Sequence, residues 1–94
     1  MKMTTLRAEA RDRDCQVRLP YTCNGDSSTV VLAHFRLAGI SGLGYKSPDF
    51  IGAWTCSACH ALVDRDKSPD VQLAFAHGVF RTQAQLLREK DLFR

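Results

Sequence analysis

The distribution of apolar residues divides the chain into short segments and predicts a small mixed fold of strands and helices. The run TVVLAHF, residues 29–35, is rich in β-branched residues and is typical of a strand. The run FIGAWT, residues 50–55, is apolar and aromatic, which predicts a second strand packed on the first. Around Val17 and Leu19, apolar and polar residues alternate, which predicts a short strand that ends at Pro20.

Two segments carry the pattern of helices. The run SACHALVDR, residues 57–65, contains no helix breaker and predicts a helix. Ser68, Pro69 and Asp70 are typical of a helix start, with a capping serine, a proline in the first position and an acid in the first turn. A helix over residues 68–90 then follows. Its predicted apolar stripe comprises Val71, Phe75, Val79 and Leu86, with Phe80, Ala84 and Leu87 alongside.

The segments between these elements are predicted turns and loops. Residues 23–28, CNGDSS, have turn chemistry, and residues 38–49 hold three glycines and a proline, which predicts a long loop. Residues 4–12 favour a short polar helix or arm. We expect one domain over residues 1–94, comprising an N-terminal arm (1–12), a cysteine-bearing core (13–66) and a final helix (68–90).

Length and composition narrow the class of protein. The chain has 94 residues, of which 45% are hydrophobic and 24% charged, so we expect one globular domain with a modest core. No apolar run approaches the roughly 18 residues that span a bilayer, and the start lacks an apolar signal segment. We therefore expect a cytoplasmic protein without a membrane segment. The net charge of +3 permits a nucleic-acid partner without requiring one.

Four cysteines fall into two pairs with the spacing of metal ligands. Cys56 and Cys59 form a C-x-x-C, and Cys15 and Cys23 enclose seven residues that include a turn. Zinc prefers four soft ligands supplied by two turns, and cysteines in a reducing compartment are more often metal ligands than disulfides. We predict a structural zinc ion without chemistry of its own. A redox pair, a disulfide and four buried free thiols are the alternatives.

A second set of polar side chains adjoins this predicted zinc site. Successive helix residues lie about 100° apart, so His60 faces away from the ion that Cys59 binds. Asp64, four residues on, shares the face of His60. The two can hold a divalent cation with open water positions, or they can form a hydrogen-bonded surface pair. A hairpin that leads into this helix would bring His34 toward them. His34 is then suited to act as a general base on water, and the alternative is a structural histidine.

Taken together, these segments resemble the HNH, or ββα-metal, nucleases, and among them the small prophage-encoded branch typified by YbcO. The resemblance rests on ARDRDCQVRLPYTCNG, VVLAHFRLAG and KSPDFIGAWTCSACHALVDR. It extends to AFAHGVFRTQAQLLRE and so covers nearly the whole chain. It implies an α+β fold, namely a small zinc-stabilised ββα-metal, treble-clef-like domain with an additional C-terminal helix. It also implies an endonuclease that hydrolyses DNA phosphodiester bonds with Mg²⁺ or another divalent cation.

The same resemblance assigns roles to single residues. It makes His34 the general base and makes His60 and Asp64 the ligands of the catalytic cation. It places Asp49 where the family has a polar residue that orients the histidine or fixes the loop. Ala33 departs from the pattern, because many of these nucleases have an acid or histidine there as a further ligand. Basic residues flank the site in sequence and could contact phosphates; they are Arg18, Arg36, Lys46, Arg65 and Lys67.

Two other functions fit the same sequence. The first is a non-catalytic, zinc-stabilised nucleic-acid-binding module, and the absence of a ligand at Ala33 favours it. The second is a zinc-stabilised protein-interaction domain, which needs no metal at His60. A second metal site outside the cysteines would distinguish the enzyme from both alternatives. The five basic residues belong either to a DNA interface or to an ordinary solvated surface.

Overall fold

Three helices and one two-stranded sheet form the regular structure of residues 3–40 and 47–90, which the computed structural model describes. In chain order the elements are α1 (Met3–Glu9), the 3-10 helix η1 (Ser27–Thr29), β1 (Val31–His34), β2 (Gly52–Thr55), α2 (Ser57–Arg65) and α3 (Pro69–Lys90). The chain is thus a small α+β protein, as the sequence predicts. Within the described residues, no helix is both long enough and apolar enough to cross a membrane.

The two predicted central strands exist and pair with each other, although both are shorter than expected. β1 and β2 are antiparallel, with Val31 opposite Thr55 and His34 opposite Gly52. The start of the first predicted strand is taken by η1, because the side chain of Asp26 accepts a hydrogen bond from the amide of Ser28 and caps a helical turn. The hairpin leads directly into α2, whose bounds match the prediction.

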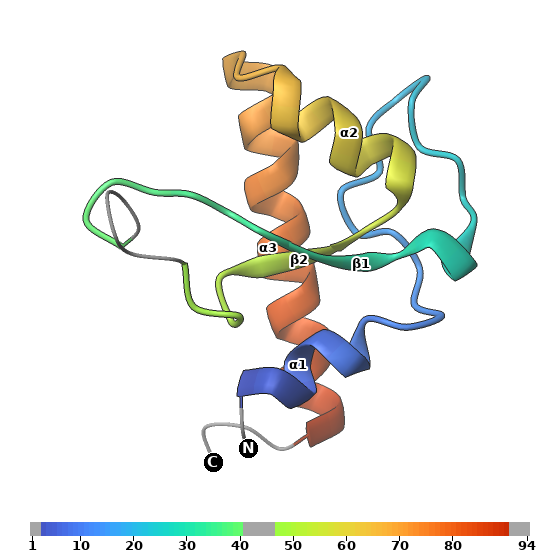
Figure 1. Cartoon of the computed structure of the whole chain (residues 1–94), viewed down its shortest axis with the longest axis vertical. Helices are drawn as coiled ribbons and strands as arrows, with labels where there is room; N and C mark the ends of the chain where they lie inside the picture. The colour runs from blue at the N-terminus through green and yellow to red at the C-terminus, as the bar shows by residue number, and fades with distance from the viewer. Residues whose placement is uncertain (1–2, 41–46, 91–94) are drawn as a thin grey trace.

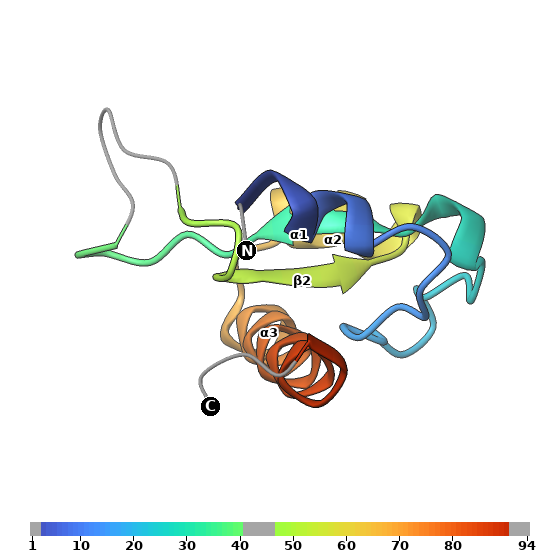
Figure 2. The same ribbon diagram turned by 90° about the horizontal axis from the view of Figure 1, so that it is seen from below.

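The sheet lies between helices. α3 lies across one side of the hairpin and α1 lies on the other (Figures 1 and 2). α3 packs mainly against β2, every residue of which is buried. The ring of Phe35 meets the ring of Phe75 edge-on, with centroids 5.0 Å apart. Leu6 in α1 and Ala10 just after it are buried, so the predicted polar arm is a helix that contributes to the core.

The predicted strand around Val17 and Leu19 is wrong. Both side chains are buried, as their alternation with polar residues implies. However, the backbone of Arg18 has a positive φ of 55°, which interrupts an extended conformation. The segment touches the sheet through one backbone hydrogen bond, from the amide of Gln16 to the carbonyl of Trp54 at 2.7 Å. Alternation indicates which side chains are buried, whereas a strand also needs a repeated ladder of hydrogen bonds.

Several close contacts attach α3 to the rest of the chain, and two of them involve Thr82 and Gly78. The backbone amide of Trp54 donates a hydrogen bond to the buried hydroxyl of Thr82 at 3.0 Å. At Gly78 the helix touches the segment after α1, since an added Cβ there would lie 2.8 Å from Cγ2 of Val17 and 3.1 Å from its Cα. These contacts fix the position of α3 relative to both the sheet and the cysteine-bearing loop.

The two apolar faces of α3 have different environments. Val71, Phe75, Val79 and Leu86 are buried, as predicted. The placement of Phe80, Ala84 and Leu87 beside the core is wrong, because all three are exposed. The reason is the helical step of about 100° per residue, which turns Phe80 away from the sheet when Val79 faces it, and Leu87 away when Leu86 faces it.

Candidate functional site

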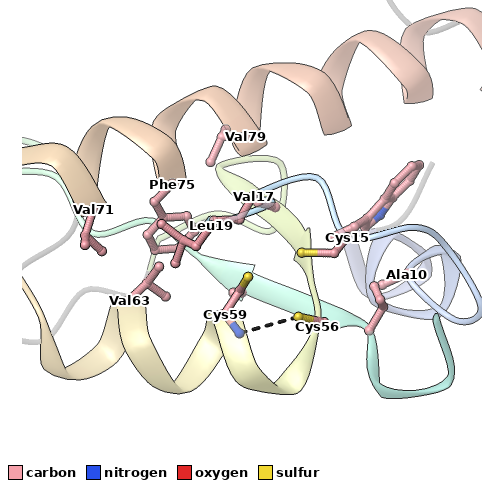
Figure 3. Packing of buried hydrophobic residues seen from close by; sticks show 14 of the residues in the cluster. Ala10, Cys15, Val17, Leu19, Cys56, Cys59, Val63, Val71, Phe75 and Val79 are labelled. Atoms are coloured by element: carbon pink, nitrogen blue, oxygen red, sulfur yellow. Dashed lines mark hydrogen bonds between the residues drawn. The ribbon is translucent and has the colours of Figure 1, made fainter. Parts of the chain in front are cut away.

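The four cysteines come together between the loop after α1 and the start of α2. Their Sγ atoms all lie within 4.8 Å of one another, and those of Cys23 and Cys56 are 3.9 Å apart. Figure 3 shows Cys15, Cys56 and Cys59 converging beneath the apolar contacts of α3. A tetrahedral zinc ion with Zn–S bonds of about 2.3 Å requires sulfurs about 3.8 Å apart. The cluster therefore fits a metal ion such as zinc.

Backbone hydrogen bonds favour the thiolate form of one cysteine in this cluster, Cys56. Cys56 is the N-cap of α2, and its Sγ accepts a hydrogen bond from the amide of Cys59 at 3.4 Å (Figure 3, dashed line). Burial acts to raise the pKa of Cys56, but hydrogen bonds from the backbone amides of Cys59 and Asn24 outweigh it and lower the pKa to about 7. Burial raises the pKa of Cys59 and of Cys23. Donors directed at sulfur stabilise the anionic form that binds metals.

A second group of side chains lies at the end of β1. Nε2 of His34 is 2.6 Å from Oδ1 of Asp49, and Nε of Arg7 donates to the same oxygen at 3.2 Å. The loop that carries Asp49 returns to the hairpin because the hydroxyl of Ser47 donates to the carbonyl of Phe35 at 2.5 Å. Three segments distant in sequence, namely α1, β1 and the end of the long loop, thus meet at one carboxylate.

The ionised carboxylate of Asp49 determines which ring nitrogen of His34 carries the proton. Burial alone would raise the pKa of Asp49, but hydrogen bonds with His34 and Arg7 outweigh it and hold the pKa below its ordinary value. An ionised carboxylate can only accept hydrogen bonds, so Nε2 of His34 carries the proton. In a neutral imidazole the lone pair is then on Nδ1. The His34 side chain is 31% exposed, against 5% for Asp49, so solvent reaches the histidine while its partner stays protected.

The third group is the pair His60 and Asp64, one turn apart on α2. Nε2 of His60 lies 3.6 Å from Oδ2 of Asp64, beyond ordinary hydrogen-bonding distance. The side chains are 38% and 71% exposed. Cys59 and Val63, which precede them, are buried. α2 therefore directs its cysteine inward and this pair outward, as the helical step predicts.

The structure does not bring His34, His60 and Asp64 into one compact ligand cluster. Across residues 3–40 and 47–90, the only group of three or more potential ligand side chains within 4.8 Å of one another is the four cysteines. Ala33 adds no ligand, because its methyl side chain has no donor atom. It is buried in the core at 2% exposure, whereas the neighbouring His34 is part-exposed.

The predicted basic residues are dispersed. Nε of Arg18 donates to the carbonyl of Cys15, and Nζ of Lys67 donates to the carbonyl of Val63, so these two support backbone structure. Arg36 and Arg65 are exposed. Lys46 lies outside the described residues. Arg7 was not predicted from the sequence, because its partner Asp49 is 42 residues away and α1 has no motif that marks the contact.

Several arginines instead line a surface groove of about 550 Å³ between the loop after α1 and the C-terminal half of α3. They are Arg13, Arg18, Arg81 and Arg88, and Asp12 and Asp14 line it as well. Arg13 lies over the Trp54 ring, 4.5 Å from its centroid, and pairs with Glu9 and Glu89. The groove is lined by neither His34 nor His60, so it is a separate surface from the histidine sites.

Comparison with known proteins identifies relatives along nearly the full length. Residues 4–91 match the family model described as "Putative nuclease YbcO". The protein of that name from Escherichia coli strain K12 is 47% identical over 92 residues, covering 93% of this chain and 95% of the relative. The counterpart in Enterobacteria phage 82 matches with the same identity and coverage.

A solved structure agrees with this comparison. It is described as "Structure of a putative bacteriophage protein from Escherichia coli str. K-12 substr. MG1655" and superposes with a TM-score of 0.77 at 39% identity. The match covers 92% of this chain and 100% of that one. Sequence and fold thus agree over nearly the whole length of the chain. This chain belongs to the YbcO family.

Proposed function

We propose that this chain is a metal-dependent endonuclease of the HNH type that hydrolyses DNA phosphodiester bonds. The observation that carries the proposal is the hydrogen bond of 2.6 Å between His34 and the buried Asp49. The order of hairpin and helix, β1, β2 and α2, supports assignment to the ββα-metal, treble-clef-like fold. The description of the family as a nuclease supports the reaction class.

His34 would act as the general base on water. With Nε2 held by Asp49, its Nδ1 is the nitrogen able to accept a proton. Asp49 would position the ring and stabilise the imidazolium that forms, which is the role of a buried carboxylate behind a catalytic histidine. Arg7 shares Oδ1 of Asp49 and would help to hold that carboxylate ionised and in place.

The metals would have separate roles. Cys15, Cys23, Cys56 and Cys59 would hold a structural zinc ion, with every position filled by sulfur. His60 and Asp64, exposed on one face of α2, would hold Mg²⁺ or another divalent cation. A cation bound there supplies charge stabilisation for the phosphate and its leaving oxygen. Because alanine at position 33 has no donor atom, His60 and Asp64 are the two ligands that the proposal assigns to this cation.

Plasmid cleavage by purified variants in a panel of divalent cations tests this proposal. His34→Ala should reduce cleavage by about 10²–10⁴-fold, the usual contribution of a general base, with zinc content and circular dichroism unchanged. Asp64→Ala should also reduce cleavage, and raised Mg²⁺ or Mn²⁺ should restore part of it, whereas no cation should rescue His34→Ala. His77→Ala, an exposed histidine on α3, is the matched control and should cleave as wild type does.

A second function rests on the buried side chain of Ala33, which supplies no metal ligand. It is a zinc-stabilised nucleic-acid-binding module without catalysis. If wild-type protein binds DNA with a steep salt dependence but cleaves none with any cation, this second function replaces the first. If His34→Ala cleaves as well as wild type, the assignment of His34 as the base is wrong.

A further inference from the structure

α3 has an outward apolar face that the fold itself does not use. Leu73, Phe80 and Leu87 are 56%, 65% and 42% exposed, although all three are large apolar side chains. They recur every seven residues, close to two helical turns, and therefore form one line along the side opposite the core. The exposed Ala84 lies beside this line. In Figure 2, α3 forms the outermost layer on its side of the sheet, so this face is open to approach.

From this arrangement we infer that the outer face of α3 pairs with the same face of a second copy of the chain, with the two helices antiparallel. The spacing is self-complementary about Phe80, since Leu73 precedes it by seven residues and Leu87 follows it by seven. In a two-fold antiparallel pair, Phe80 meets the partner's Phe80, and Leu73 meets the partner's Leu87. A two-fold interface of this kind requires the same surface on both copies, and this stripe meets that requirement.

Charged residues at the ends of the stripe select the antiparallel direction. Asp70 and Arg88 are 18 residues apart, which is five helical turns, so they lie on the same flank of the stripe. Asp70 precedes Phe80 by ten residues and Arg88 follows it by eight. In the antiparallel pair each Asp70 is therefore offset from the partner's Arg88 by two residues, about 3 Å along the axis. In a parallel two-fold pair, each of these charges would lie on the opposite flank from its copy in the partner, so Asp70 and the partner's Arg88 would not come together.

The other charged group near the centre does not oppose this pairing. Nη1 of Arg81 donates to the carbonyl of Gln16 in its own chain at 2.7 Å, which holds the guanidinium beside the sheet edge. The core-facing residues Val79 and Leu86 are 5% and 2% exposed, so pairing uses only surface that folding leaves free. With 22 residues, α3 is about 33 Å long and can support a continuous helix–helix contact.

Sedimentation equilibrium of the full zinc-loaded chain tests the inference. Wild type should be a concentration-dependent dimer. Phe80→Glu should weaken the dimer at least about thirtyfold, as loss of a central aromatic anchor does. Its circular dichroism and zinc content should be unchanged, because Phe80 is exposed. Leu37→Glu, at 49% exposure outside α3, is the matched control and should leave the dimer intact. A wild-type chain that stays monomeric at millimolar concentration overturns the inference, as does a Phe80→Glu variant that dimerises as wild type does.

Exchanging the charges of Asp70 and Arg88 tests whether the two α3 helices pair in the antiparallel direction. Asp70→Arg and Arg88→Asp should each weaken the dimer severalfold, since each sets two like charges against each other across the interface. The double variant Asp70→Arg with Arg88→Asp should return the dissociation constant to within about threefold of wild type. If Phe80→Glu dissociates the dimer but the double variant is weaker than either single one, the antiparallel arrangement is wrong.

Discussion

The backbone amide of Trp54 in β2 donates a hydrogen bond to the hydroxyl of Thr82 in α3 at 3.0 Å, and both residues are buried. The carbonyl of Trp54 accepts from the amide of Gln16. In the described part of the chain, β1 is the only strand that pairs with β2. A helix side chain and a loop amide therefore satisfy the open edge of the sheet, and they tie α3 to the strand that leads into the cysteine cluster.

We expect Thr82→Val to lower the free energy of unfolding by about 1–3 kcal/mol, because it leaves the buried amide of Trp54 without an acceptor. Valine has nearly the shape of threonine, so packing is preserved. Thr82→Ser keeps the hydroxyl and should lose less than Thr82→Val. Urea unfolding followed by circular dichroism measures both variants. Equal stability of Thr82→Val and wild type would mean that this hydrogen bond contributes little.

Gly78→Ala should destabilise the protein although alanine favours helices by about 1 kcal/mol over glycine. The added methyl group would lie 2.8 Å from Cγ2 of Val17 and 3.1 Å from its backbone, which cannot move aside as a flexible side chain could. We expect a net loss of about 1–3 kcal/mol, as is usual for overpacking. Thermal unfolding of Gly78→Ala, of Val17→Ala and of the double variant checks the cause. If the two side chains clash, the double variant should lose less than the sum of the two single losses.

Removal of the metal should unfold the domain. We expect about one zinc ion per purified chain, measured by atomic absorption, because the four sulfurs lie within 4.8 Å of one another and can surround one ion. Cys56→Ser and Cys15→Ser should each lose the ion and the cooperative unfolding transition. A strong chelator should do the same to wild type, and added zinc should reverse it. A metal-free chain that still unfolds cooperatively would contradict this prediction.

Asp49 should make part of the stability depend on pH. Its pKa is lowered because hydrogen bonds with His34 and Arg7 outweigh the effect of burial. Stability from a group with a lowered folded pKa is present above its unfolded pKa of about 3.9 and is lost as pH falls through the folded value. The difference between wild type and Asp49→Asn, about 1–3 kcal/mol at pH 7, should therefore shrink below about pH 4.

Urea titrations of both proteins from pH 7 to pH 3 measure this difference. Acid also affects the cysteine cluster, but it does so equally in both proteins, so that effect cancels in the difference. Arg7→Gln removes one donor to Asp49 and should give a smaller loss in the same direction. A difference that stays constant down to pH 3 would show that the carboxylate is not selectively stabilised in the folded state.

The sequence predicts the elements that local patterns specify. The segment 57–65 has one continuous helical pattern and lacks breakers, and it is α2. The two cysteine pairs have ligand spacing, and their sulfurs do converge. Cys59 and His60 diverge because the angular step of a helix is fixed. These features depend on spacing within one short segment, or on the preference of one metal ion for four cysteine ligands. They can therefore be derived without knowledge of the fold.

The features that the sequence could not predict depend on contacts between distant segments. Arg18 has a left-handed backbone that alternation alone does not reveal, and the predicted strand at Val17 and Leu19 fails there. Phe80 and Leu87 are apolar, and they face solvent because α3 is placed on the sheet with the neighbouring stripe of Val79 and Leu86 buried. The contact of Arg7 with Asp49 spans 42 residues and carries no local signal.

The distribution of the cysteines along the chain has a consequence for the order of folding. Cys56 and Cys59 lie on one turn, whereas Cys23 is 33 residues from Cys56, and the β1–β2 hairpin closes the intervening chain. We therefore expect a zinc ion to meet two ligands early and to complete its tetrahedron after β1 has paired with β2. Interactions that form after the transition state act mainly on the unfolding rate, so zinc should slow unfolding more than it speeds refolding.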